Sequence, residues 1–347
     1  MTDEPIIGWD VGGAHLKAAR VNPAGEVERV VQVPCPLWQG LAHFDTAVDT
    51  ARLTVGDAAL HALTMTGEMV DLFPNREEGV RQLIAAVRRR FGDVSVRFYA
   101  GTEGFLADPA AAASGESLAS ANWRATADLI AACMETALLV DIGSTTTDLV
   151  VVSAGRVVAR GRDDTTRLVA GELLYTGAVR TPLMAVASRV PFAGEWVPLM
   201  AEHFATTADV YRLTGQLPEG ADQHPAADGG EKTPAASARR LARMLGRDVE
   251  SAAPQGWRQL AEWFARTQAR QIEDACDRVW SRADVPADAP IVSAGVGRFL
   301  LPEIAAARHR RCLEFADLFP GSPASRERIS DCAPAVAVAA LARRGGS

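Results

Sequence analysis

The chain has 347 residues, more than one hydrophobic core usually organises, so its length predicts two domains. Its 36 basic and 43 acidic residues give a formal net charge of −7, which excludes a global basic field that would attract nucleic acid or anionic lipid. Five scattered cysteines without a C-x-x-C pair and six histidines without metal-ligand spacing argue against a disulfide framework and a zinc site. The chain enters a strand almost at once, and no apolar run reaches the ~18 residues of a membrane span, so we expect a cytoplasmic protein without a signal peptide.

The first hundred residues alternate between strand and helix patterns. Three short apolar segments separated by tight turns predict an antiparallel meander at the start. Helical spacing follows, and at 75–91 it places Val80, Leu83, Ile84 and Val87 on one face. In chain order we expect strands at 5–11, 15–21 and 27–33, a helix at 41–56, a strand at 59–66, a helix at 75–91 and a strand at 94–99.

The same meander pattern returns after residue 137, so the second domain is predicted to copy the first. An Ala- and Ser-rich stretch at 107–121 reads as a flexible surface connection. Residues 218–237 are rich in turn formers and poor in apolar residues, which predicts a mobile loop, either an insertion without function or a lid. The remaining expected elements are a helix at 122–136, strands at 138–142, 147–153 and 156–160, a long helix with a core stripe at 256–282, and a closing helix at 333–343 that crosses back to the first domain.

Two copies of one turn carry the strongest functional signal. In residues 6–17 and again in 138–150, an apolar strand delivers an Asp, small residues turn the backbone, and a second apolar strand follows. One Asp-x-Gly-Gly is ordinarily only a turn, but two facing copies could hold a polyphosphate through backbone N–H groups and hydroxyls, with Mg²⁺ on the two Asp residues. The predicted Mg²⁺ ligands are Asp10 and Asp141, and the predicted phosphate contacts are Gly12, Gly13, His15, Lys17, Gly143, Ser144, Thr145 and Thr146.

Both hairpins resemble the phosphate motifs of the superfamily that contains actin, sugar kinases, heat-shock ATPases and the hydantoinase/oxoprolinase ATPases. The segment 290–297 resembles its adenosine motif, with Gly295 and Gly297 as nucleoside contacts. The resemblance implies an α/β fold of two duplicated RNase H-like domains, the actin/hexokinase-like ATPase fold, with a cleft between them. We expect the first domain at 1–136 with 331–347, and the second at 137–330.

Two irregular stretches are dense in functional groups. Glu68 follows a buried strand, at the carboxyl end where open α/β sheets gather ligands, although a helix N-terminus explains an acid there equally well. The stretch 171–183 combines an acid, a phenol and a guanidinium. Arg180 could pair with a diphosphate and Tyr175 could orient an aromatic substrate, unless the stretch is only a structural turn with an Arg–Glu pair.

The segments 64–73 and 75–80 around and after Glu68, together with 120–127, 171–183 and 203–211, resemble the tetrahydromethanopterin-linked one-carbon-pathway protein family, which is similar to enzymes of methanofuran biosynthesis. The resemblance implies a transferase that joins an aminomethylfuran-methyl diphosphate to the phenol of γ-glutamyltyramine, or of a tyrosine-type analogue, as an ether and releases pyrophosphate. Mg²⁺ would be the cofactor and ATP would not be required. The partners would be small molecules, with no nucleic acid and no membrane, and a homo-oligomer stays open.

Such a reaction needs donors for the diphosphate and a base for the phenol. Lys17 and Arg180 are the candidates for the diphosphate, and the sequence does not rank Glu68, Glu172 and Asp148 as the base. The predicted site residues are, as catalytic groups, Asp10, Asp141, Asp148, Glu68, Glu172 and Arg180, and, as substrate contacts, Asn122, Tyr175, Thr176 and Thr181.

Two other functions remain open on the sequence. An ATP-dependent small-molecule kinase or hydantoinase-like ATPase would use the same three motifs, with Asp148 or Asp141 as its catalytic aspartate. A non-enzymatic nucleotide switch similar to actin-like scaffolds would form filaments on nucleotide addition.

Overall fold

The computed structural model describes residues 4–107 and 117–345, and the predicted connection at 107–121 falls largely outside them. The chain divides into two compact units. The first comprises 1–139, 150–159 and 313–347, and the second comprises 140–149 and 160–312. No helix in the described ranges is both long and apolar enough to cross a bilayer.

The first unit is built on a six-stranded sheet in the order β3-β2-β1-β4-β5-β6. The predicted opening meander is present, because β1 pairs antiparallel with β2 and β2 with β3, whereas β4 lies parallel to both β1 and β5. The strands are β1 (Ile6–Val11), β2 (His15–Val21), β3 (Val27–Pro34), β4 (Leu60–Met65), β5 (Ser95–Tyr99) and β6 (Phe105–Leu106).

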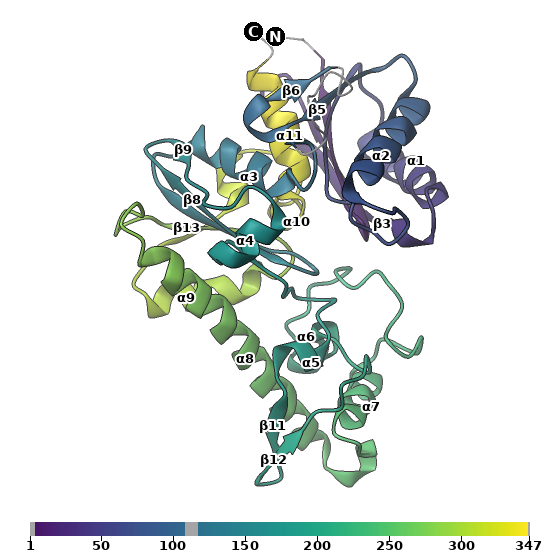
Figure 1. Cartoon of the computed structure of the whole chain (residues 1–347), viewed down its shortest axis with the longest axis vertical. Helices are drawn as coiled ribbons and strands as arrows, with labels where there is room; N and C mark the ends of the chain where they lie inside the picture. Colours follow the sequence, from purple (N-terminus) through teal and green to yellow (C-terminus); the bar gives the residue numbers. More distant parts are fainter. Residues whose placement is uncertain (1–3, 108–116, 346–347) are drawn as a thin grey trace. The chain divides into compact units, whose positions relative to one another are not determined.

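Helices cover both faces of this sheet (Figure 1). Alternate residues of β1 face opposite ways. Ile7, Trp9 and Val11 belong to the core that α1 and α2 complete, whereas Gly8 faces α11. A Cβ on Gly8 would lie 2.0 Å from the Ala335 carbonyl oxygen, so α11 packs directly on the β1 backbone. The helices of this unit are α1 (Ala42–Val55), α2 (Arg76–Phe91), α3 (Asn122–Ala131), α10 (Arg326–Asp331) and α11 (Ala333–Arg344).

A second sheet has the order β10-β8-β7-β13-β14, with β9 also paired to β8. The predicted repeat of the meander is therefore present in β7, β8 and β9. Its strands are β7 (Ala137–Ile142), β8 (Thr147–Ser153), β9 (Arg156–Val157), β10 (Leu173–Leu174), β13 (Ile291–Ala294) and β14 (Cys312–Glu314).

Outside the sheets, the second unit consists mostly of helices, and Figure 1 shows the long helix α8 running beside α5, α6 and α7. The predicted core stripe of α8 is confirmed, since Trp257, Leu260, Phe264, Ile272 and Val279 are all buried. The remaining elements are α4 (Asp164–Ala170), α5 (Leu183–Val186), β11 (Arg189–Phe192), β12 (Glu195–Pro198), α6 (Thr207–Thr214), α7 (Pro234–Met244), α8 (Pro254–Trp280) and α9 (Leu301–Ala307).

Three predicted boundaries were wrong. The helix expected at 122–136 ends at Ala131, because the Cys133 N–H turns back to the Ile130 carbonyl in a tighter turn. The strand expected at 156–160 ends at Val157, because the Arg160 N–H leaves the ladder for the Glu172 carboxylate. The loop expected at 218–237 ends earlier, because Thr233 caps α7 and Pro234 begins it.

The first unit contains a buried histidine whose protonation opposes folding. His61 on β4 is 1% exposed, and its Nδ1 accepts a hydrogen bond of 3.0 Å from the Trp9 indole N–H. Burial, assisted by the nearby charge of Arg52, lowers the pKa of His61 from 6.5 to about 4. The ring is therefore neutral in the folded protein at neutral pH.

We expect stability to fall as the pH is lowered through the window between these two values. The unfolded chain takes up a proton near pH 6.5 and the folded ring only near pH 4, so the folded state loses about 3 kcal/mol across the window. Urea unfolding of wild type and His61→Gln at pH 7 and pH 4 measures this, and the variant should lose less stability. Equal losses in the two proteins, with His43→Gln as the control, would contradict the assignment.

Candidate active site

The first hairpin places a buried carboxylate at the end of β1. Asp10 is 3% exposed and lies opposite Lys17 in the β1–β2 register, with the Lys17 Nζ 3.6 Å from its Oδ2. The Gly12 N–H donates to the His15 carbonyl over 3.0 Å and closes the turn. Lys17, predicted to contact a diphosphate, is thus paired with Asp10 in this structure, and the pair forms a local charged centre.

Small residues at this turn are required by packing. A Cβ on Gly13 would lie 2.7 Å from the Val70 side chain, and one on Gly12 would lie 2.9 Å from the His15 carbonyl oxygen. The segment after β4 also docks here, because the N–H groups of Thr66 and Gly67 donate to the Val11 carbonyl. The turn is therefore held from two sides.

Glu68 follows this docked segment and is 1% exposed. The Ser120 hydroxyl donates to its Oε1 over 2.8 Å, from a backbone with φ of 49°. A serine in the left-handed region is uncommon and is typical of a position that the surroundings fix. Asn122, a predicted substrate contact, begins α3 nearby in sequence, and its side chain accepts from the Trp123 N–H.

The second hairpin repeats the first in detail. Asp141 is 8% exposed at the end of β7, and the Gly143 N–H donates to the Thr146 carbonyl over 2.9 Å, the same three-residue closure as in the first turn. The hydroxyl oxygens of Ser144 and Thr145 lie 3.4 Å apart. The predicted duplication is thus present at the level of single hydrogen bonds.

The 171–183 stretch wraps this second turn. The N–H groups of Val179 and Arg180 both donate to the Ser144 carbonyl, over 3.1 and 2.8 Å. A Cβ on Gly177 would lie 2.5 Å from the Thr145 nitrogen, so only glycine allows the approach. Arg180 is therefore attached to the turn that carries the Ser and Thr hydroxyls.

The guanidinium of Arg180 is half-buried, and burial lowers its pKa while the Tyr175 phenol opposes the shift. An arginine keeps its charge through such a shift. Tyr175 is 70% exposed. The stretch thus brings a cation and an accessible phenol to the second hairpin.

The predicted adenosine motif reaches the same carboxylate. Gly295 has φ of 80°, and a Cβ there would lie 2.3 Å from both Asp141 Oδ1 and the Ile142 carbonyl oxygen. The Gly297 N–H donates to that carbonyl over 2.8 Å. Three segments far apart in sequence, 141–146, 177–181 and 295–297, therefore meet within the second unit.

Four other predicted site residues have structural partners. Arg167, 1% exposed, lies 2.8 Å from Asp148 Oδ1 and donates to the Glu172 carbonyl. The Glu172 carboxylate accepts from the N–H groups at 160 and 161 and pairs with Arg282 at 2.7 Å. Thr181 accepts from the Gly177 N–H, and Gln268 donates to the Thr176 hydroxyl. These contacts position the 171–183 stretch.

Arg167, Arg282, Gln268 and Ser120 are the residues that sequence reasoning missed. The side chain of each forms a hydrogen bond or ion pair with a predicted site residue that lies in a different element. Arg167, Arg282 and Gln268 have no motif of their own in the sequence. Ser120 begins the 120–127 stretch, but nothing in the local sequence pairs it with Glu68.

The donor set near the hairpins fits Mg²⁺ better than a metal held wholly by protein. Among the described residues no group of three or more His, Cys, Asp or Glu side chains could hold an ion. Mg²⁺ is usually held by one or two carboxylates with phosphates and waters. Thr64 lies beside Asp10 in the parallel β1–β4 register, and its buried hydroxyl has no hydrogen-bond partner in the described part of the chain. A polar ligand would satisfy it.

Comparison with known proteins adds a family and a fold. The family model for hydantoinase/oxoprolinase matches residues 59–344. The chain is 30% identical over 246 residues to (4-{4-[2-(γ-L-glutamylamino)ethyl]phenoxymethyl}furan-2-yl)methanamine synthase of Methanocaldococcus jannaschii, covering 71% of this chain and 72% of that protein. It is 37% identical over 82 residues to the synthase of the same name from Methanococcus vannielii, covering 24% of this chain and 36% of that protein.

Among solved structures, the nucleotide-free structure of acetone carboxylase, from work on ATP-dependent acetone carboxylation, is similar with a TM-score of 0.55 at 10% identity. The match covers 87% of this chain and 67% of that one. The predicted fold class is confirmed, and the family matches confirm the resemblance that the motifs indicated.

Proposed function

Because the chain belongs to the hydantoinase/oxoprolinase family of enzymes, we propose that it is a transferase that forms an aryl ether from a furan-methyl diphosphate and a phenol. The name of the 30% identical relative describes a product in which an oxymethyl bridge joins a furan to a phenyl ring that carries a glutamylaminoethyl group. The acceptor proposed here is accordingly γ-glutamyltyramine or a close analogue.

In the proposed step the phenol oxygen bonds to the furan methylene carbon as the bond from that carbon to the diphosphate oxygen breaks. The phenol proton passes to a carboxylate base, and pyrophosphate leaves. The ordinary pKa of a phenol is about 10, so the reaction requires a base near the acceptor. Mg²⁺, when bound to Asp10 or Asp141, would neutralise charge that develops on the leaving pyrophosphate.

The observation that most supports this proposal is the attachment of Arg180 to the second hairpin. Its backbone N–H donates to the Ser144 carbonyl, so Arg180 is held next to the turn that carries the Ser and Thr hydroxyls. Planar guanidinium groups match the geometry of phosphate oxygens. Of the three candidate bases, Asp148 and Glu172 pair with buried arginines, so we retain Glu68, which the Ser120 hydroxyl orients.

The proposal is tested by mass spectrometry and pyrophosphate assay. Purified protein is mixed with Mg²⁺, γ-glutamyltyramine and 5-(aminomethyl)furan-3-ylmethyl diphosphate, with and without ATP. Ether and pyrophosphate without ATP are expected. ADP without ether would instead favour the second candidate, an ATP-dependent kinase or hydantoinase-like ATPase. The observation that favours this candidate is the packing of Gly295 and Gly297 against Asp141 and Ile142.

Replacing Arg180 by lysine should lower kcat/KM for the diphosphate by about tenfold, because lysine keeps the charge but loses the planar pair of donors. The backbone contact to Ser144 is retained, so the fold should be unchanged. Steady-state kinetics measure the effect, with Arg266→Lys on the exposed side of α8 as the control. Equal kinetics in both variants would remove Arg180 from the diphosphate site.

A further inference from the structure

A buried glutamine on α8 contacts the segment that supports the second hairpin turn. Gln268 is 1% exposed, and its Nε2 donates to the Thr176 hydroxyl and to the Gly177 carbonyl, each over 2.8 Å. Gly177 in turn packs directly on the backbone of Ser144 and Thr145. The long helix therefore reaches the predicted phosphate turn through one side-chain amide.

Both polar groups of the Gly177 backbone are bonded to buried side chains. Its N–H donates to the Thr181 hydroxyl over 2.8 Å. Its carbonyl accepts from Gln268 and from the Thr207 hydroxyl, both over 2.8 Å. None of these three side chains is more than 3% exposed. Because buried backbone groups need their partners, these bonds fix the direction of the Gly177 backbone.

The position of Gly177 bears on the direction of one N–H in the turn. A Cβ on Gly177 would lie 2.5 Å from the Thr145 nitrogen, and the N–H groups of Val179 and Arg180 donate to the Ser144 carbonyl. That carbonyl and the Thr145 N–H belong to one trans peptide, so they point in opposite directions. The Thr145 N–H therefore points away from these two donors, as a phosphate contact requires.

The orientation of the Gln268 amide is itself determined. A carbonyl oxygen can only accept hydrogen bonds, so the NH₂ group of the amide is the one that faces Gly177. The Tyr211 hydroxyl donates to Oε1 on the other side, over 2.6 Å. All the groups that Gln268 contacts are uncharged, because burial raises the pKa of the Tyr211 phenol above its ordinary value. A carboxylate at this position would place an acceptor against the Gly177 carbonyl.

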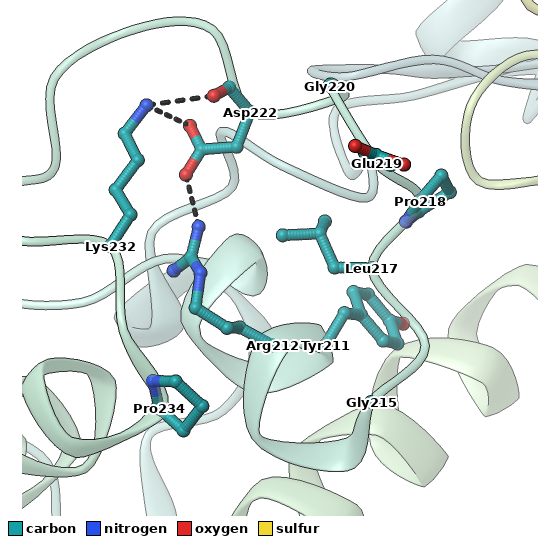
Figure 2. A pocket seen from close by; sticks show the side chains of 10 residues that line it. All are labelled: Tyr211, Arg212, Gly215, Leu217, Pro218, Glu219, Gly220, Asp222, Lys232 and Pro234. Atoms are coloured by element: carbon teal, nitrogen blue, oxygen red, sulfur yellow. Dashed lines mark hydrogen bonds and ion pairs between the residues drawn. The ribbon is translucent and has the colours of Figure 1, made fainter.

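Tyr211 also lines a polar cavity of about 320 Å³ in the same unit (Figure 2). The charges of this cavity pair with one another, since Asp222 bonds to both Arg212 and Lys232. These pairs fasten α6 to the loop that follows it. The hydroxyl that orients the Gln268 amide is therefore carried by a helix that is fixed in place.

We propose that Gln268 is a positioning residue for the diphosphate, which it does not touch. Through Gly177 it fixes the direction of the Thr145 N–H, and the affinity of the turn for diphosphate depends on this direction. The inference rests on the proposed function, which assigns the second hairpin to the diphosphate. It adds to that function a residue of α8 that belongs to none of the sequence motifs.

Titration calorimetry with inorganic pyrophosphate and Mg²⁺ tests the proposal. Gln268→Met has a similar length but no hydrogen-bond donor, and it should raise the Kd about tenfold. Gln271→Met is the matched control, because the Gln271 amide on the same helix donates over 3.0 Å to the Val186 carbonyl rather than to the turn. It should bind as wild type. Circular dichroism establishes that each protein is folded.

Gln268→Glu separates positioning from packing, since a carboxyl has the shape of the amide and changes with pH. Burial raises the pKa of a carboxyl. Near pH 6 the protonated group can donate to the Gly177 carbonyl, so the Kd should stay within about twofold of wild type. Near pH 9 the carboxylate faces that carbonyl, and the ratio of the two Kd values should rise to about tenfold. Comparison with wild type at each pH removes the titration of pyrophosphate itself.

A Kd ratio for Gln268→Glu that is raised at both pH values, or at neither, would overturn the inference. Equal Kd values in Gln268→Met and Gln271→Met would do the same, and a wild-type protein that binds no pyrophosphate would remove the positioning role. If pyrophosphate binds but no ether forms, the proposed transferase fails, and these titrations still decide the role of Gln268. If ether forms, KM for the furan diphosphate should follow the Kd while KM for the phenol stays constant.

Discussion

Asp141→Asn should lower turnover by roughly 10²- to 10³-fold while the protein stays folded. The Asp141 side chain lies against the Gly295 backbone, where a Cβ would approach its Oδ1 within 2.3 Å, so a replacement of the same shape preserves the packing. What the asparagine removes is the negative charge. If Mg²⁺ and the diphosphate depend on that charge, the loss falls on catalysis rather than on stability.

Asp10→Asn should also lower turnover, but unlike Asp141→Asn it should lower the stability of the protein as well. Asp10 pairs with Lys17, so its neutralisation weakens the pairing of a half-buried ammonium and adds a loss of stability that Asp141→Asn lacks. Circular dichroism and thermal unfolding separate the two contributions from turnover. Asp274→Asn on the surface of α8 is the control for removal of a carboxylate. A double Asp10→Ala, Asp141→Ala variant with wild-type turnover would disprove the site assignment.

The hairpins could be predicted because everything that defines them is local. Glycine, a preceding Asp and two apolar strands lie within about a dozen residues, and the hydrogen bond from Gly12 to His15, repeated from Gly143 to Thr146, follows from that spacing. The helix at 75–91 was equally accessible, because Val80, Leu83 and Val87 repeat at helical intervals and are buried as expected.

Short helices in irregular sequence escaped prediction, although some of them carried signals. Asp163 and Thr166 form a reciprocal capping box at α4, and Thr206 with Asp209 does the same at α6. These helices have too few turns to show apolar periodicity. Their stability comes from caps and from packing, and packing cannot be read from the local sequence.

The partners of the predicted site residues were beyond sequence reasoning for a different reason. Arg282 meets Glu172 across 110 positions of the chain, and Arg167 meets Asp148 only because β10 pairs with β8. Composition can suggest that an acid and a guanidinium occur together, but the choice of partner is made by the tertiary fold.

Glu172→Ala should destabilise the protein by about 3–5 kcal/mol, the usual result of removing one partner of a buried ion pair. The carboxylate is 1% exposed and accepts from two backbone N–H groups besides Arg282. Glu172→Gln should be milder, because the amide oxygen can still accept from the backbone. Denaturant unfolding measures both losses. In the double variant Glu172→Gln, Arg282→Met the losses should be less than additive, because no buried charge is then left without its partner.

Turnover per folded molecule of Glu172→Gln separates the structural role of Glu172 from the catalytic one that its sequence context suggested. A positioning carboxylate can be replaced by an amide with turnover retained at a temperature where circular dichroism shows a complete fold. A general base cannot, because the amide takes up no proton, and loss of its proton transfer typically lowers the rate by about 10²- to 10⁴-fold. Since both the Arg282 pair and the backbone bonds use the Glu172 oxygens, we expect turnover to be retained. A folded Glu172→Gln protein without turnover would make Glu172 the base and remove that role from Glu68.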